Sequence, residues 1–324
     1  MSPSGGARLV HIPNSFTWPQ AHQVMLDEHE RFLSMMVDRM VPERREAFLK
    51  LANSHREDGS GPYMGIMRTN SFGVRVGNSE NILEDMYGAV CDDISRVNHS
   101  CSPNTSTKFD KHSFSFSLFA CRDIAEGEEL TVAYCILSDG EGARAEKLLP
   151  YGIACKCLSC ADTTGESDVR RATLDDFSLD INEWAWSRTL LDDWMMNKCR
   201  EHLDLLREEG LEASDSYHAA LVAMMECYIA FGDAKRASRW AERAHKCLWA
   251  SDYESLEHFL DPESVGYLTH PLWRVRVDTR LEMVMRRLLL IGKLAGREKL
   301  EEAMASPEFA LAFAAARAEG SYDL

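Results

Sequence analysis

A cluster of three cysteines places the strongest constraint on how this chain can fold. Cys155, Cys157 and Cys160 occur in the pattern C-x-C-x-x-C. Thiolates spaced this closely can share one metal ion, but a structural zinc ion usually takes about four ligands at about 2.3 Å each. No histidine stands at a suitable spacing nearby, so a fourth ligand would have to come from elsewhere in the chain. The alternative is a set of unrelated buried or redox-active thiols, although the tight spacing favours zinc.

The remaining cysteines bear on the cellular compartment. The chain has ten cysteines in 324 residues and no basic stretch followed by an apolar core at its start, so we expect a reducing compartment, in which disulfides rarely persist. The predicted location is therefore the cytoplasm, the nucleus or both. Apart from Cys101 and the cluster, the scattered cysteines lie among apolar neighbours and are expected to be small buried hydrophobic residues. These are Cys91, Cys121, Cys135, Cys199, Cys227 and Cys247.

The charge balance restricts the classes of partner. Thirty-six basic and 52 acidic side chains give a formal net charge of −16. A general nucleic-acid binder needs a basic surface that releases counterions, so direct nucleic-acid binding is not expected. A lysine-rich protein partner is compatible with this charge. No apolar run approaches the roughly 18 residues of a membrane span, so no membrane association is expected.

Hydrophobic spacing divides the sequence into an α+β half and an all-α half. From Trp18 to about Ser54, apolar residues recur at helical spacing, and Pro42 is expected to open a second helix. Residues 63–135 contain short aromatic and β-branched segments, which are typical of strands. Nearly everything from residue 182 to residue 318 again has helical period.

Two strands are predicted within the β-patterned region. Ser113–Phe119 alternates polar and apolar residues, which is typical of a strand with one buried face. Glu129–Cys135 follows a turn at Asp123–Gly127 and predicts a second strand. Beyond the cysteine cluster, the polar stretch Asp162–Ser167 is expected to be a linker.

The helical half contains one segment with an internal pattern. Tyr217–Phe231 and Ala234–Trp249 predict two helices separated by Gly232-Asp233. Small alanines at helical spacing let two antiparallel helices approach closely, and the pair resembles a tetratricopeptide unit. The alternative is an ordinary helical hairpin, because solenoids usually need about three units and only one is clear.

Three polar segments carry the pattern that bears most directly on function. Arg96–Asn104 reads RVNHSCSPN, Arg122–Tyr134 reads RDIAEGEELTVAY, and Tyr151–Cys160 reads YGIACKCLSC. In this order they resemble the last two core motifs and the post-SET segment of the SET-domain protein lysine methyltransferases. Arg68–Gly73 resembles the segment that closes the insert in the SET-and-MYND subfamily and its fungal relatives.

This resemblance implies an overall architecture. The expected fold is α+β, with a SET-type β core, a helical insert and a zinc-bound post-SET loop, followed by an all-α tetratricopeptide-like domain. Residues 1–62 would hold the residual first SET segment and helical insert, and residues 63–137 the SET core. Residues 138–164 would form the post-SET zinc segment, and residues 165–324 the helical domain.

The resemblance also implies roles for individual residues. Cys101 would be the fourth ligand of one structural zinc ion, with Cys155, Cys157 and Cys160. The Tyr134 hydroxyl would lie beside the target amine and the departing methyl group. The remaining implied roles are contacts with S-adenosylmethionine, for which the residues are Asn98, His99, Asn70 and Tyr151, the last by packing against the adenine.

The implied reaction is methyl transfer to the side-chain amine of a lysine in a protein, histone or non-histone. Such an in-line displacement depends on alignment and on a neutral amine, so it needs neither a catalytic metal nor a general-base dyad. Ser100, His99 and Cys101 are adjacent in sequence and rarely would face one another, so hydrolase chemistry is not favoured. The oligomeric state is not predicted.

Two features of the family are missing from the pattern. The Gly-x-Gly strand that begins SET domains is not found in its expected place, and the MYND zinc finger is absent. Arg8–Pro13 resembles the tail of the first SET segment, which predicts either a chain that starts partway through the domain or a degenerate SET domain. The second function considered is therefore a non-catalytic SET and helical-repeat module that binds partner proteins.

Overall fold

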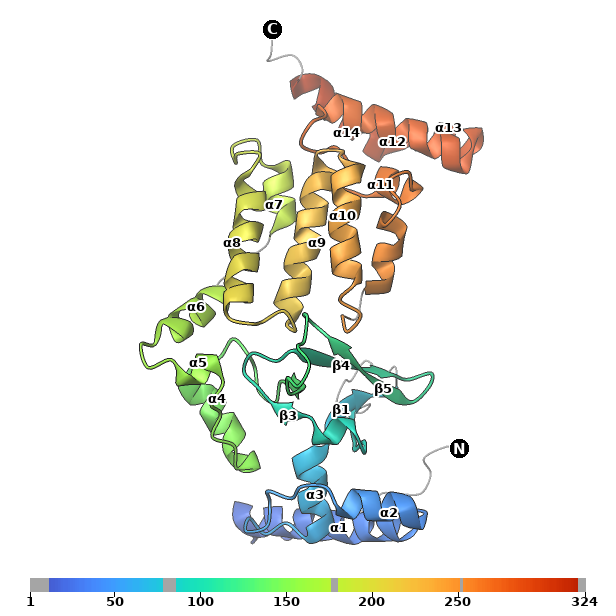
Figure 1. The fold of residues 1–324 in the computed structure, drawn as a ribbon. Coiled ribbons are helices and arrows are strands. Elements are labelled where there is room, and N and C mark those ends of the chain that lie inside the picture. Colours follow the sequence, from blue (N-terminus) through green and yellow to red (C-terminus); the bar gives the residue numbers. More distant parts are fainter. Residues whose placement is uncertain (1–11, 78–85, 176–179, 251–252, 320–324) are drawn as a thin grey trace. The chain divides into compact units, whose positions relative to one another are not determined.

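Three helices precede the strands in the first of two units into which the chain divides (Figure 1). The computed structural model describes residues 12–77, 86–175, 180–250 and 253–319. The first unit is Met1–Asp168 and the second is Val169–Leu324. Most of the segment Arg8–Pro13, expected to be part of the SET region, lies outside the described residues.

The N-terminal helices begin where the sequence supplies helix-starting residues. They are α1 (Trp18–Asp38), α2 (Pro42–Leu49) and α3 (Pro62–Asn70). Pro42 and Pro62 stand in the first turn of their helices, where a proline loses no hydrogen bond. The second helix predicted at Pro42 is therefore confirmed. The three helices and the loop after α2 share a small apolar core of Val37, Phe48, Leu51 and Ile66.

The strands form three two-stranded sheets. Strands β1 (Phe72–Arg75) and β2 (Met86–Ala89) are antiparallel, as are β4 (Thr105–Asp110) and β5 (Ser115–Ala120). Strands β3 (Asn98–His99) and β6 (Thr131–Val132) are parallel, with His99 opposite Val132. This short parallel pair brings two of the three motif segments together although they are far apart in sequence.

Both predicted strands are shorter than their sequence patterns. The strand predicted at Ser113–Phe119 begins only at Ser115, because the Asp110 carboxylate accepts hydrogen bonds from the backbone of His112 and Ser113 and holds them in a turn. The strand predicted at Glu129–Cys135 is reduced to Thr131–Val132.

The reduction of the second strand has a physical reason at each end. At its start, the Thr131 amide donates to the Asn104 side chain at 2.9 Å rather than to a neighbouring strand. At its end, the Tyr134 amide donates to the His99 ring at 3.0 Å. Side chains therefore take the donors that a longer ladder would need.

The part of the first unit that follows β6 is mainly helical. It consists of α4 (Glu141–Leu148), the 3-10 helix η3 (Leu149–Tyr151) and the short α5 (Leu158–Ala161). Helix α6 (Glu166–Asp175) begins in this unit and continues into the second. The polar stretch predicted as a linker is an ordered turn, because the Asp162 carboxylate accepts from the amides of Thr164 and Ser167.

The second unit is all helical within its described residues, as the period predicts. Its elements are α7 (Ile181–Trp186), α8 (Trp194–Glu208), α9 (Asp215–Ala230), α10 (Ala234–His245), η4 (Tyr253–Phe259), α11 (Val265–Thr269), α12 (Arg280–Ala295), α13 (Arg297–Ala305) and α14 (Pro307–Glu319).

Helices α9 and α10 pack closely against one another, and small residues allow this. Ala237, Ala241 and Ala244 on α10 are fully buried. Gly232 between the helices has a φ of 72°, a left-handed conformation that favours glycine, so the chain can reverse there. The helical pair expected from the sequence is present, whereas its membership in a tetratricopeptide-like array stays a prediction.

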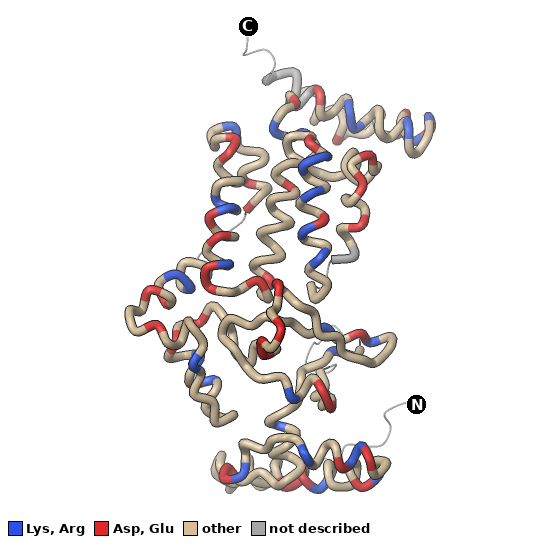
Figure 2. Tube along the Cα trace, in the orientation of Figure 1, with Lys and Arg blue, Asp and Glu red and all other residues tan. Residues whose placement is uncertain are grey.

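Charge is unevenly distributed in the second unit. Basic side chains gather along α10 (Figure 2), where Lys235, Arg236, Arg239 and Arg243 are exposed, as is Lys246 directly after the helix. This exposed face contrasts with the net charge of −16 of the whole chain.

Among the described residues, no helix combines the length and apolar character needed to cross a bilayer.

We expect the start of α10 to be stabilised by Asp233, whose carboxylate accepts from the Arg236 amide at 2.9 Å. Asp233→Ala should lower the free energy of unfolding by about 1 kcal/mol, since an N-terminal amide loses its partner. Asp193 is the matched control, because it stands at the N-cap of α8 without a side-chain cap hydrogen bond. Urea denaturation that shows equal losses for Asp233→Ala and Asp193→Ala would contradict this role.

Candidate functional site

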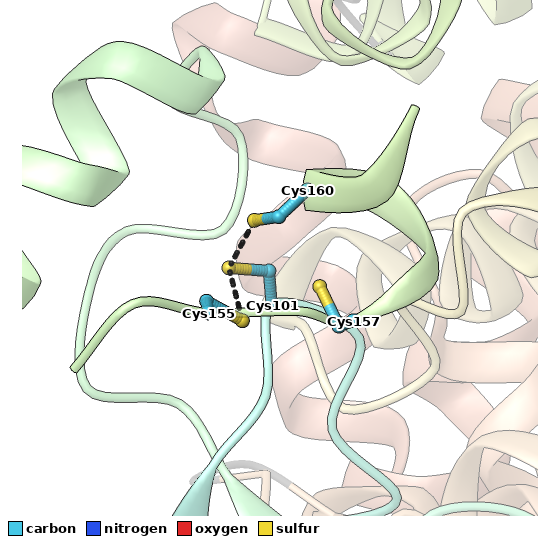
Figure 3. A group of neighbouring side chains, drawn as sticks. All are labelled: Cys101, Cys155, Cys157 and Cys160. Carbon is cyan, nitrogen blue, oxygen red and sulfur yellow. Dashed lines mark hydrogen bonds between the residues drawn. The ribbon is translucent and has the colours of Figure 1, made fainter. Parts of the chain in front are cut away.

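Four thiols from distant parts of the sequence meet at one point (Figure 3). The Sγ atom of Cys101 lies 3.9 Å from that of Cys155 and 3.5 Å from that of Cys160. Together with Cys157, all four Sγ atoms lie within 4.8 Å of one another. Cys101 is fully buried, whereas the other three are half-buried. The structure thus brings together the four residues that were expected to hold a metal.

Local structure explains how the chain presents these thiols. Cys101 follows β3, which is tied to β6 by the Ser100 amide donating to the Val132 carbonyl at 3.1 Å. Cys157 is the N-cap residue of α5, and Cys160 lies on that helix. The C-x-C-x-x-C spacing therefore places one thiol just before the short helix and the next one turn along it.

A buried arginine lies beside the thiol cluster. The Arg144 guanidinium is fully buried, donates to the Cys160 Sγ at 3.7 Å and lies 3.6 Å from the Asp168 carboxylate. Among the thiols, a hydrogen bond from Cys101 is the main reason that the pKa of Cys157 falls to about 4. The thiolate is the form that binds metals, and the lowered pKa favours that form for Cys157.

Tyr134 is held by two hydrogen bonds. Its amide donates to the Nδ1 atom of His99, and its hydroxyl donates to the Val97 carbonyl at 2.6 Å. Its ring lies 5.4 Å from the ring of His99 and 5.2 Å from that of Tyr151, measured between centroids. Burial raises the pKa of the Tyr134 phenol. The hydroxyl is therefore a neutral hydrogen-bonding group in a defined position.

His99, Tyr134 and Tyr151 form what we call the aromatic cluster. Tyr151 is the last residue of η3, and Gly152 after it adopts a φ of 68°, which turns the chain toward the cysteines. The Nε2 atom of His99 lies 3.2 Å from the Cys101 Sγ. The aromatic cluster and the thiol cluster are therefore in direct contact through this pair.

The two asparagines expected at the site have other partners. Asn98 is exposed and donates from its amide to Glu129 at 2.6 Å; it faces away from His99 because successive strand residues alternate sides. Asn70 is buried and its amide donates to the carbonyls of Ala52 and Ile66, each at 2.7 Å. Within the described residues, neither amide is hydrogen-bonded to the aromatic cluster, so a side-chain contact with a cofactor stays a prediction for both.

Asn104 is a structural residue that sequence reasoning did not single out. It is 1% exposed, and its amide group donates to Glu128 and to the Glu129 carbonyl, both at 2.9 Å, while accepting from the Thr131 amide. It thereby fastens the second motif segment to the first. Its position at the end of the NHSCSPN string carried no signal that separated it from turn-forming residues.

Cys135 corrects the expectation that the scattered cysteines are buried hydrophobic residues. That expectation holds for Cys199, Cys227 and Cys247, which are buried. Cys135 is instead half-buried, and its Sγ lies with the Cys101 Sγ and the His99 Nε2, all within 4.8 Å. Its place directly after Tyr134 was the only available signal. The two remaining scattered cysteines, Cys91 and Cys121, are also half-buried.

An apolar hollow of about 450 Å³ lies elsewhere in the first unit. Its walls come from β1, β2, β4 and β5, and none of the sequence-predicted site residues lines it. The lining includes Val74, Tyr87, Phe109, Phe114 and Phe116. Phe114 and Tyr87 are exposed at its edge.

Comparison with known proteins identifies the class of domain. Residues 14–135 match the model of the SET domain, so the matched range ends at Cys135 and does not include the C-x-C-x-x-C cluster. The chain therefore contains a SET domain.

Three relatives narrow this class. The chain is 28% identical over 229 residues to the histone-lysine N-methyltransferase set5 of Schizosaccharomyces pombe, covering 67% of this chain and 66% of the relative. It is 26% identical over 235 residues to the N-lysine methyltransferase SMYD2-B of Danio rerio, covering 68% of this chain and 50% of the relative. It is 38% identical over 77 residues to the histone-lysine N-methyltransferase SMYD3 of Homo sapiens, covering 24% and 18%. This SET-domain protein is thus related to SMYD and fungal Set5 lysine methyltransferases, and it spans less than two thirds of the length of each of these relatives.

We expect the turn that precedes β6, within the second motif segment, to lose stability in acid. The Arg122 guanidinium and the Asn104 amide lower the pKa of Glu128 to about 2, from an ordinary 4.5. Because the folded-state pKa is the lower one, the contribution of Glu128 is complete above its ordinary pKa and is lost as the pH falls toward about 2. The difference in urea midpoint between the wild type and Glu128→Gln should shrink over that range.

Glu126→Gln is the matched control for this pH dependence, since Glu126 is exposed on the same turn. It should leave the pH profile of stability nearly unchanged. If the stability of Glu128→Gln depended on pH in the same way as that of the wild type, the proposed role of this carboxylate would be wrong.

Proposed function

We propose that this protein transfers a methyl group from S-adenosylmethionine to the side-chain amine of a lysine in another protein. The observation that carries the proposal is the position of Tyr134, held between His99 and Tyr151 in a SET domain, with its hydroxyl fixed on the Val97 carbonyl. The relatives named as lysine methyltransferases support the same activity.

Methyl transfer requires the chain to align the reacting groups and does not require acid or base catalysis. S-adenosylmethionine supplies an electrophilic methyl group on a sulfonium centre. Tyr134 remains a neutral phenol because burial raises its pKa, so its hydroxyl can orient an amine without removing a proton from it. A lysine amine that enters such a partly buried aromatic environment loses hydration, which lowers its pKa and increases the neutral, nucleophilic fraction. Holding the amine in line with the methyl group then accounts for most of the rate.

The residues near Tyr134 have the chemical groups that binding of the cofactor requires. Aromatic faces suit an adenine ring, and carbonyl oxygens suit the polarised hydrogens of a sulfonium methyl group. We therefore assign the contacts with S-adenosylmethionine to Tyr151 and to the main chain around Asn98 and His99. Contact with Asn70 is part of the same proposal, although its amide nitrogen is already bonded to two carbonyls.

We further propose that Cys101, Cys155, Cys157 and Cys160 bind one structural zinc ion. Four thiolates around a tetrahedral zinc ion at about 2.3 Å lie about 3.8 Å apart. Two of the Sγ separations, 3.9 Å and 3.5 Å, are close to this spacing, and all four atoms lie within 4.8 Å of one another. Four protein ligands leave no open coordination position, so the ion would be structural. It would fasten the segment that carries Tyr151 to the loop that follows His99.

The proposed substrate is a lysine-containing protein, histone or non-histone. The net charge of −16 favours the approach of basic segments over nucleic acid. The helical second unit would act as a tetratricopeptide-like domain that contacts partner proteins. We assign the protein to the nucleus or cytoplasm, as two of the relatives above are named for histones.

Calorimetric titration with S-adenosylhomocysteine should show saturable binding to the wild type. Tyr134→Phe should then reduce methyl transfer by about a hundredfold, because the amine loses its orienting hydroxyl. The affinity for S-adenosylhomocysteine should stay nearly unchanged, since the aromatic ring is retained. Tyr217→Phe, in the second unit, is the matched control and should change neither quantity.

Two outcomes would contradict these roles. Folded, zinc-loaded protein that binds no S-adenosylhomocysteine would favour the second candidate, a non-catalytic protein-interaction module. Equal losses of methyl transfer and cofactor affinity in Tyr134→Phe would show that the hydroxyl acts in binding and not in alignment.

Metal analysis of the purified protein should find one zinc ion per chain, held by the four thiols that lie together. Cys157→Ser should lower the zinc content and weaken zinc affinity by a factor of about 10 to 100 or more, since a thiolate ligand is replaced by a poor one. Cys91→Ser, a half-buried thiol outside the cluster, should retain the full content. No zinc in the wild type, or equal loss from both variants, would refute the ligand set.

A further inference from the structure

Cys101 belongs to two groups of potential ligands at once. One is the set of four thiols, and the other is formed by His99, Cys101 and Cys135. The His99 Nε2 lies 3.2 Å from the Cys101 Sγ and 4.0 Å from the Cys135 Sγ. The structure therefore places a fifth thiol against the one ligand that comes from the SET core.

The backbone keeps this pair of thiols within reach of each other. Cys101 comes two residues after His99 in β3, and Cys135 comes three residues after Val132 in β6, and these two strand residues are paired. Their Sγ atoms lie within 4.8 Å, and a disulfide would require them to approach to about 2.05 Å.

The two thiols differ in exposure. Cys101 is 0% exposed, whereas Cys135 is half-buried. A small oxidant therefore reaches Cys135 first, and Cys101 is the buried partner that can resolve the oxidised product. This division of roles between an accessible and a resolving cysteine is typical of redox-sensitive thiols.

We propose that Cys135 is an oxidation site for hydroperoxides, and that its oxidised form captures Cys101 as a disulfide and so removes one ligand from the zinc site. This inference rests on the proposed zinc site only for its effect on the metal. The disulfide itself requires only the two thiols.

The steps balance with one molecule of hydrogen peroxide. The Cys135 sulfur attacks one peroxide oxygen, the O–O bond breaks, and the leaving hydroxide takes the thiol proton, which yields a sulfenic acid and water. The Cys101 sulfur then attacks the sulfenic sulfur, the S–O bond breaks, and the leaving hydroxide takes the Cys101 thiol proton, or a solvent proton where Cys101 is metal-bound. Two thiols lose two electrons in total, and the peroxide is reduced to two waters.

The disulfide would affect both the thiol cluster and the aromatic cluster. The zinc site would keep Cys155, Cys157 and Cys160, and a site with three thiolates holds zinc more weakly than one with four. The new bond would also join the residue after Tyr134 to the loop after His99. Oxidation would thereby loosen the segment that carries Tyr151 and restrain the segment that carries Tyr134.

The test treats the zinc-loaded full chain with hydrogen peroxide and follows two readouts that do not depend on enzymatic activity. A zinc-sensitive dye measures the released metal, and mass spectrometry of peptides made under non-reducing conditions maps the disulfide. The wild type should release zinc, and the mass of its metal-free polypeptide should fall by about 2 Da because two thiol hydrogens are lost. Digestion should yield the peptide pair containing Cys101 and Cys135. A reductant should reverse the linkage.

Cys135→Ser should hold its zinc before treatment and release it about tenfold more slowly than the wild type under peroxide. Cys121→Ser, which removes another half-buried thiol of the first unit, should behave like the wild type. Zinc release from Cys135→Ser at the wild-type rate, or a disulfide only among Cys155, Cys157 and Cys160, would overturn the proposal. A zinc content of Cys135→Ser that is already reduced before treatment would also overturn it, because Cys135 would then be a ligand.

Failure of the zinc proposal gives a different result. If the wild type holds no zinc, the proposed zinc site is refuted and zinc release can no longer be measured. Peptide mapping still shows whether the disulfide between Cys101 and Cys135 forms. Absence of the peptide pair containing Cys101 and Cys135 in peroxide-treated, folded protein would refute the oxidation site whatever the metal content.

Discussion

The contact of Cys101 with the thiols of residues 155–160 is the interaction on which the candidate site depends. It joins the loop after β3 to a segment more than fifty residues further along the chain, with Sγ separations of 3.5 Å and 3.9 Å. The short α5 offers little apolar surface of its own, and Leu158 on it is 92% exposed. Packing alone therefore does not explain the position of this segment, whereas a shared metal ion would, because metal–ligand binding free energy also stabilises the fold.

The second constraint is the two-residue parallel pairing of β3 with β6. It sets His99 opposite Val132 and so brings Tyr134 to the His99 ring and Cys135 to Cys101. Asn104 supports the same arrangement from the other side by bonding to the main chain of Glu129 and Thr131. Side-chain hydrogen bonds thus replace much of the ladder that a longer strand would supply. One short pairing consequently positions the proposed catalytic hydroxyl, the aromatic cluster and the proposed oxidation site.

Much of this organisation was predictable because the relevant signals are local or consist of ordered motifs. Helical period and the first-turn proline predicted α2, and the alanine spacing predicted the close packing of α9 and α10. The order of the three polar segments predicted a SET domain. The C-x-C-x-x-C spacing predicted three clustered thiols, and the resemblance to the family implied that Cys101 joins them. The predicted length of the strand at Glu129–Cys135 was wrong, because a strand pattern in the sequence does not reveal that Asn104 and His99 take the backbone donors of Thr131 and Tyr134.

By itself, the sequence determined the kinds of elements, the class of domain and three of the four clustered cysteines, since each of these depends on residue type, spacing or the order of motifs. Only the tertiary structure decided which polar groups face one another. It directed the amides of Asn70 and Asn98 toward main-chain and carboxylate partners, set the Tyr134 hydroxyl on the Val97 carbonyl, and placed Cys135 beside Cys101. The physical reason is that a hydrogen bond or a thiol contact acts over only a few ångströms, so its partner is selected by the packing of distant segments and not by neighbours in sequence.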